Sequence, residues 1–176
     1  MIVLRHCESE FNRLYTLTGR DPGIADPPLS ARGRSQAAAL PAVLAGHRIG
    51  RILVSPYHRA IETAQPLARE LGLTPRIQPL VRERALYSCD IGSPRSELEG
   101  RWPDLDFSGL DENWWTEGVE PVRETERRAR AFCAEAGADE AADGETLVVS
   151  HWAFLLSLTG EGMENGSWRF FNPSRR

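Results

Sequence analysis

The sequence predicts an α/β fold, a three-layer sandwich with a mainly parallel central sheet flanked by helices. Two observations carry this prediction. Short apolar runs typical of buried strands alternate with longer segments whose apolar residues recur at helical spacing. Such alternation is typical of a parallel sheet that is covered on both faces. A length of 176 residues suits one domain with a full hydrophobic core, so we expect a single domain over residues 1–176.

The first strand is predicted over residues 2–4, an apolar run that stops at Arg5 and His6. Residues 18–28 follow as a polar stretch rich in glycine and proline, which indicates a loop. Because loops after the carboxyl end of a strand commonly carry function, this loop is a candidate wall of a site.

Two helices and a second strand come next. Ser30 should cap a helix that continues toward residue 45 and that its internal proline should kink or split. Residues 51–55 form a second apolar run, and Ser55 before proline should cap a helix running to residue 71.

The middle of the chain is the least regular part. A short third strand is predicted over residues 74–78. Residues 85–121 contain several Pro and Gly residues and an adjacent pair of tryptophans, so we expect an irregular insertion packed over the active site. Large aromatic side chains mostly serve packing, so the tryptophans should anchor this insertion to the core.

The last third of the chain returns to regular structure. The predicted segments are, in order, a charged helix over 122–136, an acidic loop over 138–144, a buried strand over 146–150, a helix over 152–158, an edge strand over 168–171, and a frayed end over 173–176.

Composition excludes several classes of function. With a net charge of −4 there is no general reason to bind nucleic acid or an anionic membrane. All 21 basic residues are arginine, which excludes a phosphate-loop lysine and a Schiff base. We see neither an apolar run of membrane-spanning length nor a secretory signal. Three unpatterned cysteines argue against a disulfide framework, so a reducing cytoplasm is the expected location.

Charged and polar side chains follow the end of each predicted parallel strand. In such sheets ligands bind outside the carboxyl ends of the strands. A guanidinium group matches the oxygens of a phosphate, and a neutral imidazole beside it could attack phosphorus. We therefore expect a phosphate pocket at this edge with His6 as nucleophile. The residues that converge there are Arg5, His6, Arg59, Glu83 and His151.

This pattern resembles the histidine phosphatase superfamily, in the branch that includes the cofactor-dependent phosphoglycerate mutases. The family's motifs appear in order along nearly the whole chain. They stand here as Arg5-His6-Cys7-Glu8 with Asn12, Thr18-Gly19, Leu29-Ser30 with Gly33 and Gln36-Ala37, Ser55-Pro56 with Arg59-Ala60 and Thr63-Ala64, Glu83-Arg84 with Tyr87, and Ser150-His151-Trp152. Cys7 and Trp152 stand where the usual pattern has glycine, and the middle segment looks like that of an uncharacterised subgroup.

The resemblance implies a metal-independent phosphatase without a cofactor. It would hydrolyse phosphomonoesters of small metabolites through a phosphohistidine on His6. Arg5 and Arg59 would hold the phosphoryl oxygens, with His151 as a further, partly cationic donor. Glu83 would protonate the leaving oxygen and later activate water. Substrate contacts are expected from Asn12, Thr18, Gly19 and Trp152.

Several residues have competing interpretations. Asn12 and Thr18 suit turn chemistry as well as ligand contact. Cys7 suits small apolar packing better than nucleophilic work. The carboxylates that compete with Glu83 for the acid role are Glu8, Asp90 and Glu97, and the histidines expected on the surface are His47 and His58.

Three other functions stay open at this point. One is a phosphoglycerate mutase-type phosphotransferase, although the mutases' longer insertion is not found in this sequence. The second is a metallohydrolase that uses His6, His151 and a carboxylate, against which two nearby arginines would repel the cation. The third is a phosphate-binding module with weak or no turnover. The oligomeric state is open.

Overall fold

The computed structural model describes residues 1–138 and 144–173. In this part of the chain the centre is a five-stranded sheet in the order β3-β2-β4-β1-β5. The strands are β1 (Ile2–Arg5), β2 (Ile49–Val54), β3 (Arg76–Ile77), β4 (Glu145–Ser150) and β5 (Trp168–Phe170). The first four are parallel, and β5 pairs with β1 in the antiparallel direction at one edge. The mainly parallel sheet and its edge strand are thus confirmed.

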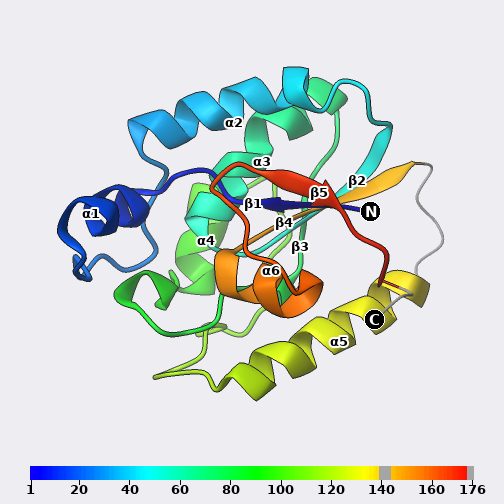
Figure 1. Cartoon of the computed structure of the whole chain (residues 1–176). Helices are drawn as coiled ribbons and strands as arrows, with labels where there is room; N and C mark the ends of the chain where they lie inside the picture. The colour runs from blue at the N-terminus through cyan, green and yellow to red at the C-terminus, as the bar shows by residue number, and fades with distance from the viewer. Residues whose placement is uncertain (139–143, 174–176) are drawn as a thin grey trace.

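Helices cover both faces of this sheet. Figure 1 shows α2 and α3 on one side and α5 and α6 on the other, with α1 at the end of the sheet opposite the N-terminus. The helices are α1 (Glu10–Thr18), α2 (Ala31–Val43), α3 (His58–Leu71), α4 (Arg95–Arg101), α5 (Val122–Ala138) and α6 (Trp152–Thr159), with short 3₁₀ turns η1 (Pro79–Val81) and η2 (Ser88–Asp90). The three-layer sandwich is confirmed.

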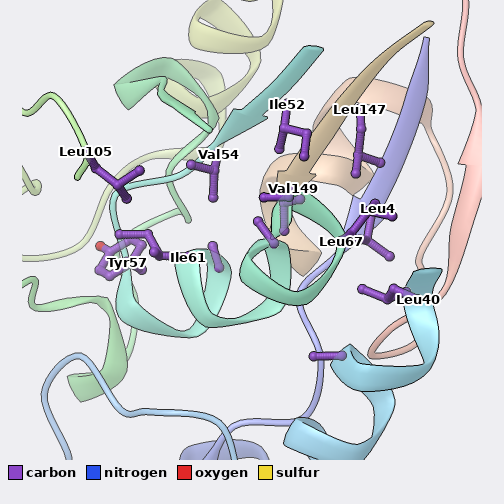
Figure 2. Close-up of a cluster of buried hydrophobic side chains, with 14 of the residues drawn as sticks. Leu4, Leu40, Ile52, Val54, Tyr57, Ile61, Leu67, Leu105, Leu147 and Val149 are labelled. Carbon is purple, nitrogen blue, oxygen red and sulfur yellow. The ribbon is translucent and has the colours of Figure 1, made fainter. Parts of the chain in front are cut away.

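The core is split between the two faces because successive strand residues point in opposite directions. In β1, Ile2 and Leu4 belong to the cluster under α2 and α3, while Val3 belongs to the cluster under α5 and α6. Figure 2 shows the first cluster, in which Leu4 lies with Leu40 and Leu67. With both faces buried, the open ends of the strands are where polar side chains can gather.

The prediction that Ser55 caps the helix running to residue 71, which is α3, is wrong. α3 begins at His58, and its N-cap is Tyr57, which makes no side-chain capping bond. Ser55 instead continues the sheet, because its N–H donates to the carbonyl of Val149 (3.1 Å). Its hydroxyl is also in use, lying 2.7 Å from Nε2 of His151.

The helix predicted to start at Ser30, which is α2, begins as predicted. The Ser30 hydroxyl accepts a hydrogen bond from the Gly33 N–H (3.0 Å). Of the two effects predicted for Pro41, a kink or a split, the split is wrong, since α2 continues to Val43. Pro41 lies in the last turn, so little helix remains beyond its missing N–H.

Two short helices, α1 and α4, were not expected. α1 begins at a capping box in which the Ser9 hydroxyl accepts from the Asn12 N–H (3.2 Å) and the Asn12 side chain accepts from the Ser9 N–H (3.1 Å). It ends at Gly19, which takes the left-handed conformation at φ 66°. Asparagine at the third position is a weaker capping signal than glutamate, and the helix is only 9 residues long.

The tryptophans anchor the middle segment to the core, as predicted. Trp114 is buried among the side chains under α2 and α3, and its Nε1 donates to the carbonyl of Ser93 (2.9 Å). Trp102 and Trp115 pack against the same cluster.

Most of the predicted acidic loop and of the predicted frayed end, residues 139–143 and 174–176, lies outside the described residues. Within the described ranges, none of the helices has the length and apolar character needed to cross a membrane.

Candidate active site

The two histidines are brought together by strand register. His6 and His151 each follow the last residue of a strand, and β1 and β4 pair in parallel with Arg5 opposite Ser150. The His6 N–H extends this ladder by donating to the carbonyl of Ser150 (2.8 Å). The ring centroids of the two histidines are therefore only 5.0 Å apart.

The tautomer of His6 follows from one contact. Its Nδ1 lies 2.7 Å from the carbonyl oxygen of Cys7, which can only accept, so Nδ1 carries the proton. Nε2 is left with a lone pair. Burial lowers the pKa of His6 well below 6.5, and the nearby charges of Arg59 and Arg5 lower it further. The lowered pKa favours a neutral imidazole with one nitrogen available for attack on phosphorus.

His151 is held in the same neutral form. Its Nε2 lies 2.7 Å from the Ser55 hydroxyl, while its Nδ1 is buried and has no hydrogen-bond partner within residues 1–138 and 144–173. Burial lowers the pKa of His151 well below 6.5, with smaller contributions from Arg59 and His6. Burial, more than the charges of the arginines, thus opposes the partly cationic state predicted for this residue.

Two arginines lie in the wall of the same cavity. Arg5 donates from Nη1 to the carbonyl of Met163 (2.7 Å), and its Nε is buried with no hydrogen-bond partner in the described part of the chain. Arg59, which is only 2% exposed, donates from Nη1 to the carbonyl of Cys89 (2.6 Å) and from Nη2 to Asp90 (3.2 Å). Each guanidinium is thus oriented by protein oxygens and keeps further N–H groups for an anion.

Glu83 lies at the first turn of α6. One carboxylate oxygen accepts from the N–H groups of Arg84 (2.8 Å) and Phe154 (3.0 Å), and the other accepts from the N–H of Ala153 (3.1 Å). Although these bonds favour the charged form, burial and then the negative charge of Asp90 raise the pKa of Glu83. A carboxyl with a raised pKa can hold a proton for donation at higher pH.

These groups share one cavity of about 320 Å³. Of the residues predicted for the site, the cavity wall includes Arg5, His6, Asn12, Arg59, Glu83 and Trp152. His151 does not line this wall; it is fully buried, with its ring beside that of His6. From the predicted insertion, Leu86, Tyr87, Cys89 and Asp90 also belong to the wall.

Thr18 and Gly19 lie outside this wall. The Thr18 hydroxyl donates to the carbonyl of Leu14 (2.9 Å) and accepts from the N–H of Arg20 (3.2 Å). Both residues finish α1, so their predicted contact with substrate has no support from this arrangement. Asn12 caps α1 and also borders the cavity, where its contact with a ligand stays a prediction.

The carboxylates that compete with Glu83 differ in position. Glu8 accepts from the Ser30 hydroxyl (2.6 Å) and Glu97 is solvent-exposed, and neither borders the cavity. Asp90 does border it and pairs with Arg59. This pairing, like the contact of Ser55 with His151, joins residues distant in the chain and has no sequence signal of its own.

The prediction of a surface position for His58 is wrong. His58 is 2% exposed, accepts from Trp102 Nε1 at Nδ1 (3.1 Å), and lies 3.2 Å from the Ser93 hydroxyl at Nε2. The first turn of α3 is covered by the segment that carries these partners. Burial lowers the pKa of His58 to about 4.

Cys7 packs as predicted. Its side chain is fully buried in the core and lies beside Gly166, away from the cavity wall. Burial raises the pKa of the Cys7 thiol to about 11. Among residues 1–138 and 144–173, no group of three His, Cys, Asp or Glu side chains could hold a metal ion.

Comparison with known proteins identifies the family. The model of the histidine phosphatase superfamily (branch 1) matches residues 1–173. The chain belongs to this superfamily. Among histidine phosphatases, a glucosyl-3-phosphoglycerate phosphatase from Mycobacterium tuberculosis is 27% identical over 96% of this chain and 82% of its own length. Phosphoserine phosphatase 1 of Hydrogenobacter thermophilus is 38% identical over 52% of this chain and 39% of its own.

A solved histidine phosphatase has the same architecture. The structure of a mycobacterial glucosyl-3-phosphoglycerate phosphatase in complex with VO3 superposes with a TM-score of 0.68 at 26% identity. The alignment covers 96% of this chain and 90% of that one. The resemblance read from the motifs is thus confirmed over nearly the full chain.

Proposed function

We propose that this protein is a metal-independent phosphatase that hydrolyses phosphomonoesters of small metabolites through a phosphohistidine on His6. The observation that carries the proposal is a neutral, buried His6 with a free Nε2 in a cavity walled by Arg5 and Arg59. The phosphatase names of the curated relatives support the same reaction class. Cys7, Cys89 and Cys133 form no disulfide, which supports a reducing cytoplasm as the place of action.

In the first step the substrate phosphate enters between the two guanidinium groups, which hold its oxygens. His6 Nε2 forms a bond to phosphorus as the bond between phosphorus and the leaving oxygen breaks. Glu83 gives its proton to that oxygen, so the alcohol leaves neutral and Glu83 becomes a carboxylate.

In the second step the carboxylate of Glu83 takes a proton from water. The water oxygen bonds to phosphorus, the phosphorus–nitrogen bond breaks, and inorganic phosphate leaves with His6 and Glu83 restored. Splitting the reaction through a covalent intermediate replaces one hard displacement by two easier ones.

His151 supports both steps as a hydrogen-bond donor. If the Ser55 hydroxyl donates to Nε2, the proton of His151 stands on Nδ1. Among the described residues, this nitrogen and Nε of Arg5 are buried polar atoms without a hydrogen-bond partner. Such atoms are costly unless something satisfies them, and in this proposal the two side chains turn toward the phosphoryl oxygens when substrate binds.

The test is His6→Ala, assayed on a generic aryl phosphate. Loss of the nucleophile should lower kcat by at least about a thousandfold and abolish the acid-labile phosphoprotein seen after rapid quenching. His47→Ala is the matched control because His47 packs against Trp168 and Phe170 at the sheet edge, outside the cavity. Wild-type turnover by His6→Ala would refute the proposal.

The same assays separate the other functions. Loss of activity in chelator would indicate a metallohydrolase. Isomerisation of phosphoglycerate with its bisphosphate primer would indicate a mutase-type phosphotransferase. Tight binding of phosphate without turnover or phosphohistidine would indicate a binding module.

A further inference from the structure

We infer that the active-site cavity selects phosphomonoesters whose leaving group is large, uncharged and apolar, and that Leu86, Tyr87 and Trp152 bind this group. The inference rests on the proposed function, because it names the substrate class of the same cavity. It depends on the side chains around the cavity mouth rather than on the phosphate end, by which we mean Arg5, His6 and Arg59.

The first observation is a cluster of exposed apolar side chains, which we call the apolar rim. It consists of Leu86, Tyr87, Ile91, Val119 and Trp152, each between 40% and 62% exposed. Single exposed apolar residues are ordinary, but several gathered in one place mark a binding surface. The rim is such a gathering, and three of its members line the cavity that holds His6.

The second observation is a neighbouring hollow. A cavity of about 380 Å³ is lined by Ile91 and Val119 and shares Leu86, Tyr87 and Asp90 with the cavity that holds His6. The two cavities are therefore adjacent at Leu86 and Tyr87, and the inference is that a leaving group longer than a few atoms extends past these side chains from one to the other. Most of its apolar surface would then leave water.

The third observation is an ordered aromatic wall. The ring centroids of Phe11, Tyr15 and Tyr87 lie 5.5 to 5.6 Å from one another. The hydroxyls of Tyr15 and Tyr87 are 3.4 Å apart. Rings fixed by one another lose little conformational freedom when a ligand packs against them.

Charge argues against an acidic leaving group. The charged side chains lining the second cavity are Asp90 and Glu117, both acidic. In the first cavity Arg84 is the cationic side chain lining the wall besides Arg5 and Arg59, and its Nε donates to the carbonyl of Glu120 (2.8 Å). With Arg5 and Arg59 assigned to the phosphate, a carboxylate on the leaving group would meet acidic side chains in the second cavity and only this tethered guanidinium in the first.

The test is the binding of alkylphosphonates, which occupy the cavity without being hydrolysed. Dissociation constants for methyl-, butyl- and octylphosphonate are measured by titration calorimetry on the full chain. We expect the affinity to rise by about tenfold or more from methyl to octyl, because each added methylene loses contact with water. The kcat/KM values for the matching alkyl phosphates should rise in the same order.

Leu86→Ser and Trp152→Gly should each remove most of this dependence on chain length. The matched control is Leu71→Ser, since Leu71 is also a partly exposed leucine but lies at the end of α3 outside both cavities. This variant should keep the wild-type ratio of octyl to methyl affinity.

Equal affinity for all three phosphonates would overturn the inference. A carboxylated phosphonate that binds more tightly than the alkylphosphonates would also overturn it, if Arg84→Gln abolishes that advantage. Such a result would mean that the cavity wall binds acidic leaving groups. Neither outcome touches the proposed function, which depends on turnover and on His6. Conversely, a rising phosphonate series without hydrolysis would refute the phosphatase and retain the apolar selectivity.

Discussion

Asp90 connects the phosphate end of the cavity to the apolar rim through a single buried carboxylate. One oxygen accepts from Arg59 Nη2 (3.2 Å), and the other accepts from the N–H groups of Leu86 (3.0 Å) and Tyr87 (3.0 Å). Asp90 is 3% exposed, so water screens these contacts little. Its contacts suit a positioning residue that orients Arg59 better than an acid that replaces Glu83.

Asp90→Asn should change the pH dependence of turnover. Burial and then the Asp90 charge raise the pKa of Glu83, so removing that charge lowers this pKa. Glu83 must be protonated to serve as the acid, and activity falls as pH rises through its pKa. The descending limb of the kcat profile should therefore move to lower pH in the variant, with KM raised because Arg59 is less well held.

Arg59 is less well held in this variant, and its positive charge opposes that of Asp90 at Glu83. Burial lowers the pKa of Arg5, and the charge of Glu83 opposes that effect. Glu97→Gln is the control, since Glu97 lies outside the cavity wall. If Asp90→Asn lowered kcat but left the descending limb at its wild-type pH, Asp90 would have only a structural role.

At the scale of elements, the start of α2 packs directly on the segment after His6. The Ser30 N–H donates to the carbonyl of Glu8 (2.9 Å), and the Glu8 N–H donates to the side chain of Gln36 (2.9 Å). A Cβ atom on Gly33 would lie only 1.9 Å from the Glu8 carbonyl oxygen. The close approach of helix and active-site segment therefore requires glycine at this position.

Gly33→Ala should lower the free energy of unfolding by about 1–3 kcal/mol, since helix and segment must move apart. Urea denaturation measures this loss. Gly100→Ala is the control, because Gly100 is also helical and a Cβ there meets nothing within 4 Å. That variant should be stabilised by about 0.5–1 kcal/mol. Equal stabilities of the two variants would show that the packing of α2 adapts without cost.

The elements differ in how well the sequence predicts them. β1 and β4 were predictable because strands buried on both faces are continuous apolar runs. α1 and α4 were not, because short helices show little periodicity and depend on caps and packing. β3 has only 2 residues, and its pairing with β2 defines it more than its composition does.

The active-site residues also differ in how well the sequence predicts their positions. Arg5, His6 and His151 could be placed from the rule that parallel strands end at one edge. Burial of His58 and the roles of Ser55 and Asp90 could not, because each depends on contacts between residues 30 or more positions apart. Local sequence indicates which groups approach the sheet edge, while tertiary contacts decide how each is held.

At the scale of the whole molecule, the buried histidines tie folding to pH. Burial is the largest cause that lowers the pKa values of His6, His58 and His151 below 6.5. Unfolding exposes all three, so below pH 6.5 the unfolded chain binds protons that the native protein does not. The free energy of unfolding should therefore fall as the pH drops below 6.5.

The buried carboxyl group of Asp26 changes stability with pH in the opposite direction. Burial raises the pKa of Asp26 from 3.8 to about 6, so between these values the native protein holds a proton that the unfolded chain has lost. The stability that Asp26 contributes is present at low pH and is lost as the pH rises through 6. Asp26 lies beside His58, with its carboxylate accepting from the His58 N–H (3.0 Å). Over the range from about pH 4 to 6 the two neighbours offset each other.

Substituting either His58 or Asp26 should show how the other residue changes stability with pH. In His58→Gln the rise in unfolding free energy from about pH 4.5 to 6 should be smaller than in the wild type by up to ~1.4 kcal/mol per pH unit, because one proton no longer binds on unfolding. In Asp26→Asn the same rise should be steeper by a similar amount. Urea denaturation at several pH values measures both slopes. Excess inorganic phosphate should raise the free energy of unfolding at every pH if it binds only the native site. Parallel curves for the wild type and both variants would mean that neither group changes its protonation on unfolding, and the acid sensitivity would then come from other groups, His6 and His151 among them.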